Sequence, residues 1–264
     1  QGDKPTHPEL LDWLAVQLVK ENGWRLKPLI KKMVLSATYR QATHTDKTKL
    51  EKDPLNQWLT RAHRTRLSAE QIRDQLLAVS GLLDSLTGGP PVAPKSLGLS
   101  ANRIPAWAIS GPAAERRRTL YSFWRRTEPF PAMMTFDSPD RTLCSSRRIR
   151  TNTPLQALNL LNHETYFEAA KQLAQKHFDP ASSATAQIKE LYRQLYYKNI
   201  SAAQLQHLLK LHEAAVSNFA KAPQEVIEMF PTQKDRSPTV LPQIGALSMV
   251  ANALLNLDAF VVKN

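Results

Sequence analysis

Residues 242–257 read Pro-Gln-Ile-Gly-Ala-Leu-Ser-Met-Val-Ala-Asn-Ala-Leu-Leu-Asn-Leu, and this stretch decides the fold class. Its large apolar residues recur at intervals of three or four: Ile244, Leu247, Val250, Leu254 and Leu257. Such spacing places side chains on one face of an α-helix. We therefore expect an amphipathic helix here, as one member of a helical bundle.

Helix start signals recur upstream of this stretch. Capping-box spacing, with Ser or Thr followed three residues later by Gln or Glu, occurs at Thr6, Ser68, Thr153 and Ser201. Further helices are expected from Pro28, from Asp53-Pro54, from about Thr185 to Tyr197 and from Pro223. The helix that begins at Ser68 is expected to end only at Gly88-Gly89-Pro90.

The centre of the chain lacks these signals. Residues 88–112 contain four of the eight glycines and five prolines, which indicates a loop. Residues 119–124 (Thr-Leu-Tyr-Ser-Phe-Trp) have strong β propensity and predict one short strand. Three further prolines then keep the chain irregular up to Thr153.

These patterns together predict an all-α fold: an irregular helical bundle with a long central loop region rich in Pro, Gly and Arg, and at most one short β element. We expect a single helical domain over residues 1–264, with N-terminal helices at 1–87, an irregular Arg-rich centre at 88–152 and C-terminal helices at 153–264. A hydrophobic content of 42% and a charged content of 22% are typical of a globular domain with a core.

The overall charge restricts the class of partner. A formal net charge of +12 favours an anionic partner such as an acidic glycan, a lipid headgroup or nucleic acid, although net charge also serves solubility alone. The single cysteine, Cys144, excludes an internal disulfide and a multi-thiolate metal site. No C-x-x-C-H motif occurs, so we expect no cofactor in this chain. No apolar run approaches the roughly 18 residues of a membrane span.

Familiar catalytic motifs are incomplete. His163-Glu164 and His212-Glu213 begin an H-E-x-x-H pattern, but Phe167 and Val216 occupy the positions of the second histidine, so no metal site is predicted. Cys144 to Thr151 fits the C-x5-R-[ST] spacing of cysteine phosphatases and part of the sulfatase C-x-P-x-R motif. The phosphatase glycine is absent, Ser146 replaces the sulfatase proline, and both families use α/β scaffolds. We therefore interpret Cys144 as structural or incidental.

The densest charge lies between Arg103 and Arg150, with ten arginines, no lysine and four acids. Arginine favours planar, bidentate pairing with oxyanions. The candidate ligand-binding residues are Arg116, Arg117, Arg118, Arg125, Arg126, Asp137, Asp140, Arg147 and Arg148, with Arg116 and Arg117 expected at the surface. The alternative is internal: Asp137 and Asp140 accept hydrogen bonds from Arg147 and Arg148 and so fix the loop between Trp124 and Thr153.

Several motifs resemble the planctomycete PSD-one family of domains of unknown function. They are Thr6-His7-Pro8-Glu9-Leu10-Leu11, Ser36-Ala37-Thr38-Tyr39-Arg40-Gln41, Arg66 to Asp74 (Arg-Leu-Ser-Ala-Glu-Gln-Ile-Arg-Asp), Gly88-Gly89-Pro90-Pro91, Phe136-Asp137-Ser138-Pro139-Asp140, Pro154 to Asn162 and Ala253 to Phe260. The resemblance implies the C-terminal part of a secreted or periplasmic multidomain protein, with a cytochrome-c-like domain upstream that would carry haem c. Genes of the family often neighbour sulfatases, and no catalytic residue is established for it.

The resemblance also implies that the chain is a fragment, because it begins at the Thr6 motif and lacks an N-R-x-W…F-G segment of the family. We expect the helix from Pro8 to Lys20 to pack its leucine face partly against residues that precede this sequence.

We expect an accessory or binding module whose partners are upstream domains of the same polypeptide and an anionic, sulfated polysaccharide. One alternative is a polysaccharide-acting enzyme that uses Asp137 and Asp140 as a carboxylate pair, although neighbouring arginines would lower the pKa of both groups and disfavour an acid. The other is a nucleic-acid-binding domain, which rests on charge alone because no known module is recognisable.

Overall fold

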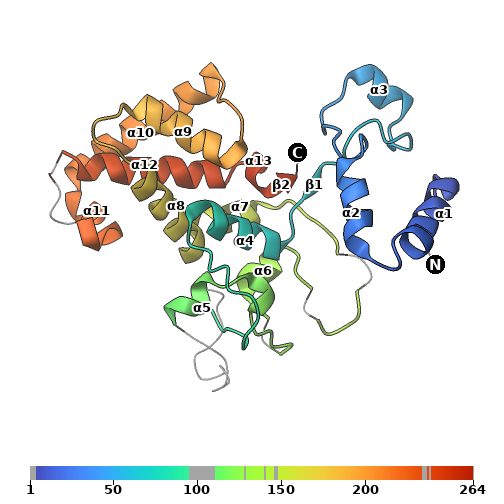
Figure 1. Ribbon diagram of the computed structural model, residues 1–264. Coiled ribbons are helices and arrows are strands. Elements are labelled where there is room, and N and C mark those ends of the chain that lie inside the picture. Colours follow the sequence, from blue (N-terminus) through green and yellow to red (C-terminus); the bar gives the residue numbers. More distant parts are fainter. Residues whose placement is uncertain are drawn as a thin grey trace. The chain divides into compact units, whose positions relative to one another are not determined.

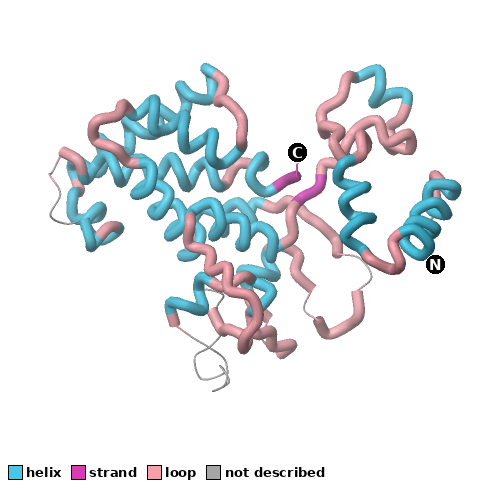
Figure 2. The backbone as a smooth tube through the Cα atoms, viewed as in Figure 1, coloured by secondary structure: helices cyan, strands magenta, loops and turns pink. Residues whose placement is uncertain are grey.

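The structure is a computed structural model that describes residues 4–94, 111–127, 129–139, 141–145, 148–233, 237 and 239–263. The described chain is mostly helical, and its only sheet pairs two short strands, β1 (Thr65–Arg66) and β2 (Val262–Lys263) (Figures 1 and 2). The predicted all-α fold with at most one short β element is therefore confirmed. The chain divides into two compact units, which we call the N-terminal unit (Gln1–Thr65 with Val262–Asn264) and the core unit (Arg66–Val261).

Helix α12 (Leu241–Leu255) is the centre of the core unit. It packs against α8 (Glu164–His177) and α10 (Ala202–Lys221), and nearly every one of its residues is buried (Figure 1). A Cβ added at Gly245 would lie only 3.0 Å from the Phe219 ring, so glycine permits the close approach of α10. Leu257, which we expected on the apolar stripe, lies beyond the end of α12 and is 42% exposed.

Polar caps begin the other long helices of this unit. Complete capping boxes at Ser68 and Ser201 start α4 (Ala69–Ser80) and α10, as predicted. Ser183 caps α9 (Ala184–Tyr196) and Thr153 caps α7 (Pro154–Asn162). Helix α4 ends at Gly81, whose φ of 80° is left-handed, so the expected end at Gly88 is wrong.

Short elements complete the core unit: α5 (Pro112–Arg116), a 3-10 turn (Thr119–Tyr121), α6 (Pro131–Thr135), α11 (Pro223–Met229), a 3-10 turn (Pro231–Gln233) and α13 (Asp258–Val261). The short strand expected at residues 119–124 is wrong. The 3-10 turn occupies its first half, and only one isolated bridge, between Val92 and Ser122, has β geometry there. Hydrogen bonds from α4 to the turn, described below, override the local β propensity.

The N-terminal unit contains α1 (Pro8–Val16), which continues into a π-helical turn (Gln17–Glu21), then α2 (Leu26–Leu35) and α3 (Lys47–Lys52). The capping box expected at Thr6 is wrong, because the Thr6 hydroxyl bonds to the His7 ring at 2.9 Å instead of to the helix. The helix expected from Asp53 is also wrong. The Asp53 carboxylate accepts the backbone N–H groups of Gln57 and Trp58, which closes a turn after α3.

Burial differs sharply between the units. Among the described residues of the N-terminal unit, Leu29 is the only large apolar side chain that is buried, and α1 has no buried residue at all. In the part of the chain that the structure describes, no helix has the length and apolar character needed to cross a membrane.

Candidate anion-binding cleft

The segment from Arg66 to Asp74 organises the site. Its first residues lead into α4, Ser68 caps that helix, and the remaining residues form the first half of the helix. Residues near its start, Arg66 and Glu70, lie beside a small cleft, whereas Arg73 and Asp74 hold the irregular centre of the chain.

Arg73 is a buried arginine that bonds to the backbone of the central segment. Only 2% of it is exposed, and its guanidinium donates to the carbonyl oxygens of Glu115 (2.7 Å) and Arg117 (2.9 Å) and to the hydroxyl of Thr119 (3.2 Å). Burial lowers the pKa of Arg73, and the negative charges of Asp74 and Glu115 counter that effect. The Arg73 guanidinium thus supplies hydrogen bonds to backbone carbonyl groups that no regular secondary structure satisfies.

Asp74 completes this attachment from the next position of α4. Its carboxylate accepts both the backbone N–H and the hydroxyl of Thr119, each at 2.7 Å, and Arg118 donates to it at 3.3 Å. Two successive side chains of one helix therefore fix residues 115–119.

Arg117 is part of the folded centre. It is 5% exposed, donates to the Gly88 carbonyl at 2.6 Å and lies 4.3 Å above the Tyr121 ring. The Tyr121 hydroxyl accepts the Gly88 N–H at 2.8 Å. The expectation of a surface position is therefore wrong for Arg117, because its guanidinium bridges two loops instead of reaching solvent.

The other candidate arginines are dispersed. Arg116 and Arg126 are exposed, Arg125 is half-buried, and Arg118 is occupied by Asp74. Arg141, which lies 4.8 Å above the Trp124 ring, shows that stacking in this region serves the loop itself. Two of the predicted site residues, Asp140 and Arg147, lie outside the described residues.

Asp137 fixes the loop before α7, as we expected, but with other partners. Its carboxylate accepts the Thr151 N–H (2.7 Å), the Thr151 hydroxyl (2.9 Å) and the Gln156 amide (3.3 Å). The expected pairing with Arg148 is wrong, because Arg148 donates to Glu70 in the first turn of α4 at 2.7 Å. The backbone N–H of Thr151, which lies just before the α7 cap, is the donor that Asp137 binds in place of Arg148.

Burial is the largest single influence on Glu70 and would raise its pKa, but the hydrogen bond and charge of Arg148, together with local hydrogen bonds that include Ser68, outweigh it, so the pKa of Glu70 lies below its usual value. The ion pair ties the loop of Arg148 to the start of α4.

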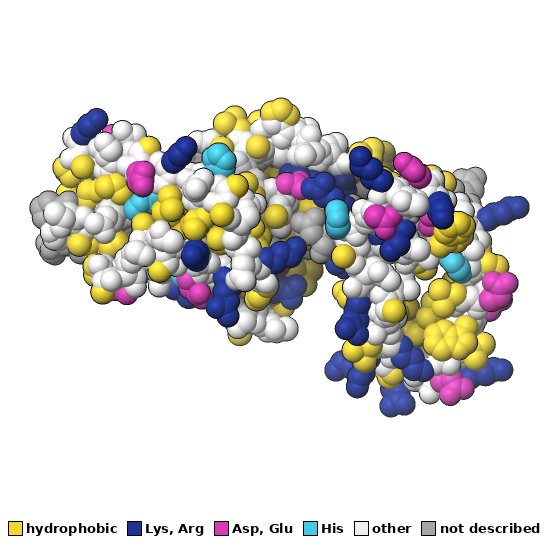
Figure 3. Space-filling model, turned by 90° about the horizontal axis from the view of Figure 1, so that it is seen from above, with side chains coloured by type: hydrophobic (Ala, Val, Ile, Leu, Met, Phe, Trp, Pro, Cys, Tyr) yellow, Lys and Arg dark blue, Asp and Glu magenta, His cyan; other side chains and the backbone are white. Residues whose placement is uncertain are grey.

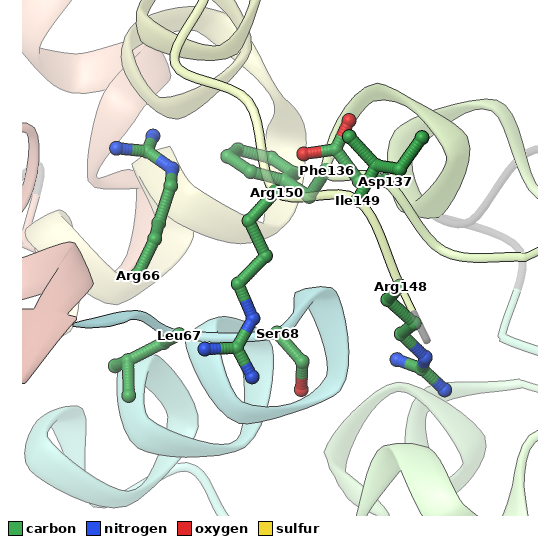
Figure 4. Close-up of a pocket in the computed structure, with 8 residues that line it drawn as sticks. All are labelled: Arg66, Leu67, Ser68, Phe136, Asp137, Arg148, Ile149 and Arg150. Carbon is green, nitrogen blue, oxygen red and sulfur yellow. The ribbon is translucent and has the colours of Figure 1, made fainter. Parts of the chain in front are cut away.

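Three arginines surround the resulting cleft. Arg66, Leu67 and Ser68 line one side, Phe136 and Asp137 another, and Arg148, Ile149 and Arg150 the third. Figure 4 shows the Arg150 side chain extending from its loop toward Leu67 and Ser68, with Arg66 and Arg148 on either side of it. The enclosed space is about 10 Å³, which suits one water molecule or one oxygen atom of a larger group.

The cleft has more cationic than anionic groups. Arg148 is neutralised by its ion pair with Glu70. Burial lowers the pKa of Arg66, and the charge of Asp137 partly counters that effect. The Nε atom of Arg66 is buried and has no hydrogen-bond partner among the residues that the structure describes. Arg150 is exposed and forms no ion pair with any described residue. The arrangement therefore offers unused guanidinium donors to an oxyanion.

Comparison with known proteins places the chain in a family. The family model described as "PSD1: Protein of unknown function (DUF1553)" matches residues 1–212, most of the chain. The chain belongs to the PSD1 family. No curated protein and no solved structure matches it. The PSD1 match includes residues 1–65 of the N-terminal unit and the Arg66–Asp74 segment, but it ends before α12, so the motif at residues 253–260 lies outside it.

Sequence reasoning missed Arg66, Arg73 and Arg150 as important side chains. The first two belong to the Arg66–Asp74 motif, which we used only to recognise the PSD1 family. A signal was available at Glu70 and Arg73, which are charged positions three residues apart on α4. A charged residue within an apolar helical face requires a partner. Cys144 is exposed and free and does not line the cleft.

Proposed function

We propose that this chain is an accessory, non-catalytic module of an extracytoplasmic multidomain protein, and that it binds a sulfated polysaccharide. The sulfate group would be held at the cleft between Arg66 and Arg150. The upstream domains of the same polypeptide would supply any redox or catalytic chemistry.

The observation that carries the proposal is a pair of arginines, Arg66 and Arg150, that form no ion pair within the described part of the chain. Arg66 has a buried donor with no acceptor, and Arg150 is exposed beside it with no ion pair among the described residues. A planar guanidinium donates two parallel hydrogen bonds to a sulfate or carboxylate. The small hollow admits one oxygen of that group and excludes a sugar ring, so the polysaccharide would lie across the cleft and not inside it.

The position of Asp137 supports binding rather than hydrolysis. Its carboxylate already accepts hydrogen bonds from Thr151 and Gln156, which hold it in the loop before α7. A glycosidase acid must be able to approach the glycosidic oxygen of its substrate. The oxygens of Asp137 are instead occupied by Thr151 and Gln156.

Binding of heparin, a heavily sulfated polysaccharide, and of neutral dextran tests the proposal. Arg150→Ala should weaken heparin binding about tenfold, since charge-assisted hydrogen bonds contribute about 1.5–3 kcal/mol. Arg193 is the matched control, because its side chain is 71% exposed on α9 of the same unit. Arg193→Ala should change affinity less than about twofold.

The measurement is titration calorimetry at two salt concentrations. Equal losses for Arg150→Ala and Arg193→Ala would mean that only the net charge attracts heparin, and the proposed cleft would be wrong. Binding of dextran as tight as that of heparin would reject the sulfate as the recognised group.

A further inference from the structure

Helix α2 of the N-terminal unit exposes a continuous apolar stripe. Leu26, Ile30 and Met33 are 60%, 53% and 40% exposed. Their spacing of i, i+4 and i+7 puts them on one side of the helix. Leu29, by contrast, is 7% exposed, so α2 already has a packed side and the stripe is additional.

Helix α1 is equally uncovered and contacts α2. The Lys32 ammonium of α2 lies 5.7 Å above the Trp13 ring of α1 and also donates to Gln17. Trp13 itself is 48% exposed. A nine-residue helix with no buried residue is marginal in water, because short helices depend on tertiary packing. We call Trp13, Leu26, Ile30 and Met33 the docking face.

Basic side chains flank the docking face. Lys27 and Lys31 follow Leu26 and Ile30 by one residue each, are exposed, and form no ion pair with any described residue. Figure 3 shows Lys and Arg side chains gathered beside apolar side chains in the N-terminal unit, at the right of the view. An apolar stripe with lysines along its edge is complementary to an apolar stripe with acids along its edge.

We propose that the docking face binds an amphipathic helix of a protein partner that carries acidic side chains beside its apolar residues. The partner's apolar side chains would cover Leu26, Ile30 and Met33, and its carboxylates would pair with Lys27 and Lys31. This inference is independent of the anion-binding cleft, which lies in the core unit.

A membrane surface fits the same residues less well. On α1, Leu11 and Val16 are both exposed and project about 140° apart, at about 100° per residue, so a flat bilayer covers one of them at most. A partner helix that lies along the α2 stripe does not need to cover Leu11 and Val16 together.

A synthetic helix of about 18 residues, with leucines at i, i+4 and i+7 and glutamates beside them, is the probe. Its matched control replaces every glutamate with lysine. Titration followed by tryptophan fluorescence should show the acidic peptide binding at least about tenfold more tightly than the basic one. The double variant Lys27→Glu/Lys31→Glu should reverse this preference, whereas Lys47→Glu/Lys52→Glu on α3 should leave it unchanged.

Ile30→Asp should abolish binding of the acidic peptide while far-ultraviolet circular dichroism stays unchanged. If Ile30→Asp loses helix content, the Lys27→Glu/Lys31→Glu variant alone tests whether the docking face binds the acidic peptide. Equal affinity for the two peptides, or an unaltered preference in the Lys27/Lys31 variant, would overturn the proposal. Binding to phosphatidylglycerol vesicles without binding to the acidic peptide would also overturn it, in favour of a lipid surface.

Discussion

Helices α12 and α1 have similar local sequence signals but opposite environments. Both begin with a proline in their first turn and both are rich in leucine. Helix α12 is buried over almost its whole length, with Ile244, Leu247 and Leu254 all at 0% exposure. Helix α1 has no buried residue.

The difference teaches that a helical pattern predicts a helix but not what covers it. In the core unit, α8 and α10 supply the partner surfaces for α12. In the N-terminal unit the described residues bury no residue of α1, so its apolar side chains are available for a partner. Apolar burial is the main favourable contribution to folding, and the core unit therefore holds most of the stability of this chain.

The largest effect should come from a leucine of α12. Leu247→Ala removes a fully buried side chain and leaves a cavity, so it should lower the free energy of unfolding by about 2–5 kcal/mol. The same change at Leu10, which is 45% exposed on α1, should cost less than about 0.5 kcal/mol. Urea denaturation followed by circular dichroism measures both values. Equal losses would mean that α1 has a core of its own.

Arg73 should give the next largest effect. Arg73→Met keeps an apolar stem but leaves the carbonyls of Glu115 and Arg117 and the Thr119 hydroxyl without their donor. The expected loss in unfolding free energy is about 2–4 kcal/mol, because buried acceptors become unsatisfied. Thermal denaturation of this variant beside Arg193→Met checks it. A change as small as that of the exposed control would show that Arg73 does not hold the central segment.

The sequence predicted the parts of the fold that depend on neighbouring residues. Ser68 and Ser201 begin helices because their hydroxyls and the following glutamines bond locally. The errors lie where distant groups decide. The segment 119–124 does not form a strand because Arg73 and Asp74, more than forty residues earlier, bond to Thr119.

The candidate site was predicted in part for the same reason. Arg148 and Asp137 were identified from charge density, and both line the cleft. Arg66 was not, because it lies in another part of the sequence and reaches the cleft only through the folding of α4. Which acid pairs with Arg148 depends on helix geometry, and single-sequence reasoning has no means to choose Glu70 over Asp137.

Asp137→Asn should have a moderate effect. Residue 137 has a φ of 59°, a conformation that asparagine tolerates as well as aspartate does, so the change removes charge without backbone strain. Weaker bonds to Thr151 and Gln156 should lower the unfolding free energy by about 1–2 kcal/mol. Differential scanning calorimetry measures the shift. A variant of unchanged stability that lost a measurable hydrolysis of polysaccharide would favour the enzyme interpretation.

The smallest effect concerns the ion pair of Glu70 with Arg148. Because the folded-state pKa of Glu70 is lowered, its contribution is present above the unfolded value of about 4.5 and is lost as the pH falls through the folded value. The contribution should stay below about 1 kcal/mol, because the Arg148 side chain is 36% exposed. Arg148→Gln should reduce the loss of stability between pH 5 and pH 3, as measured by urea denaturation at each pH. The same pH dependence in the variant and the original chain would contradict the pairing.

Hydrogen exchange of backbone amides tests the contrast between the two units most directly. Amides of α12 and of the buried part of α4 should exchange only through unfolding of the core unit, whereas those of α1 and α2 should exchange orders of magnitude faster. Addition of the acidic amphipathic peptide should slow exchange in α1 and α2 alone. Protection of α1 equal to that of α12 in the absence of any partner would contradict the account.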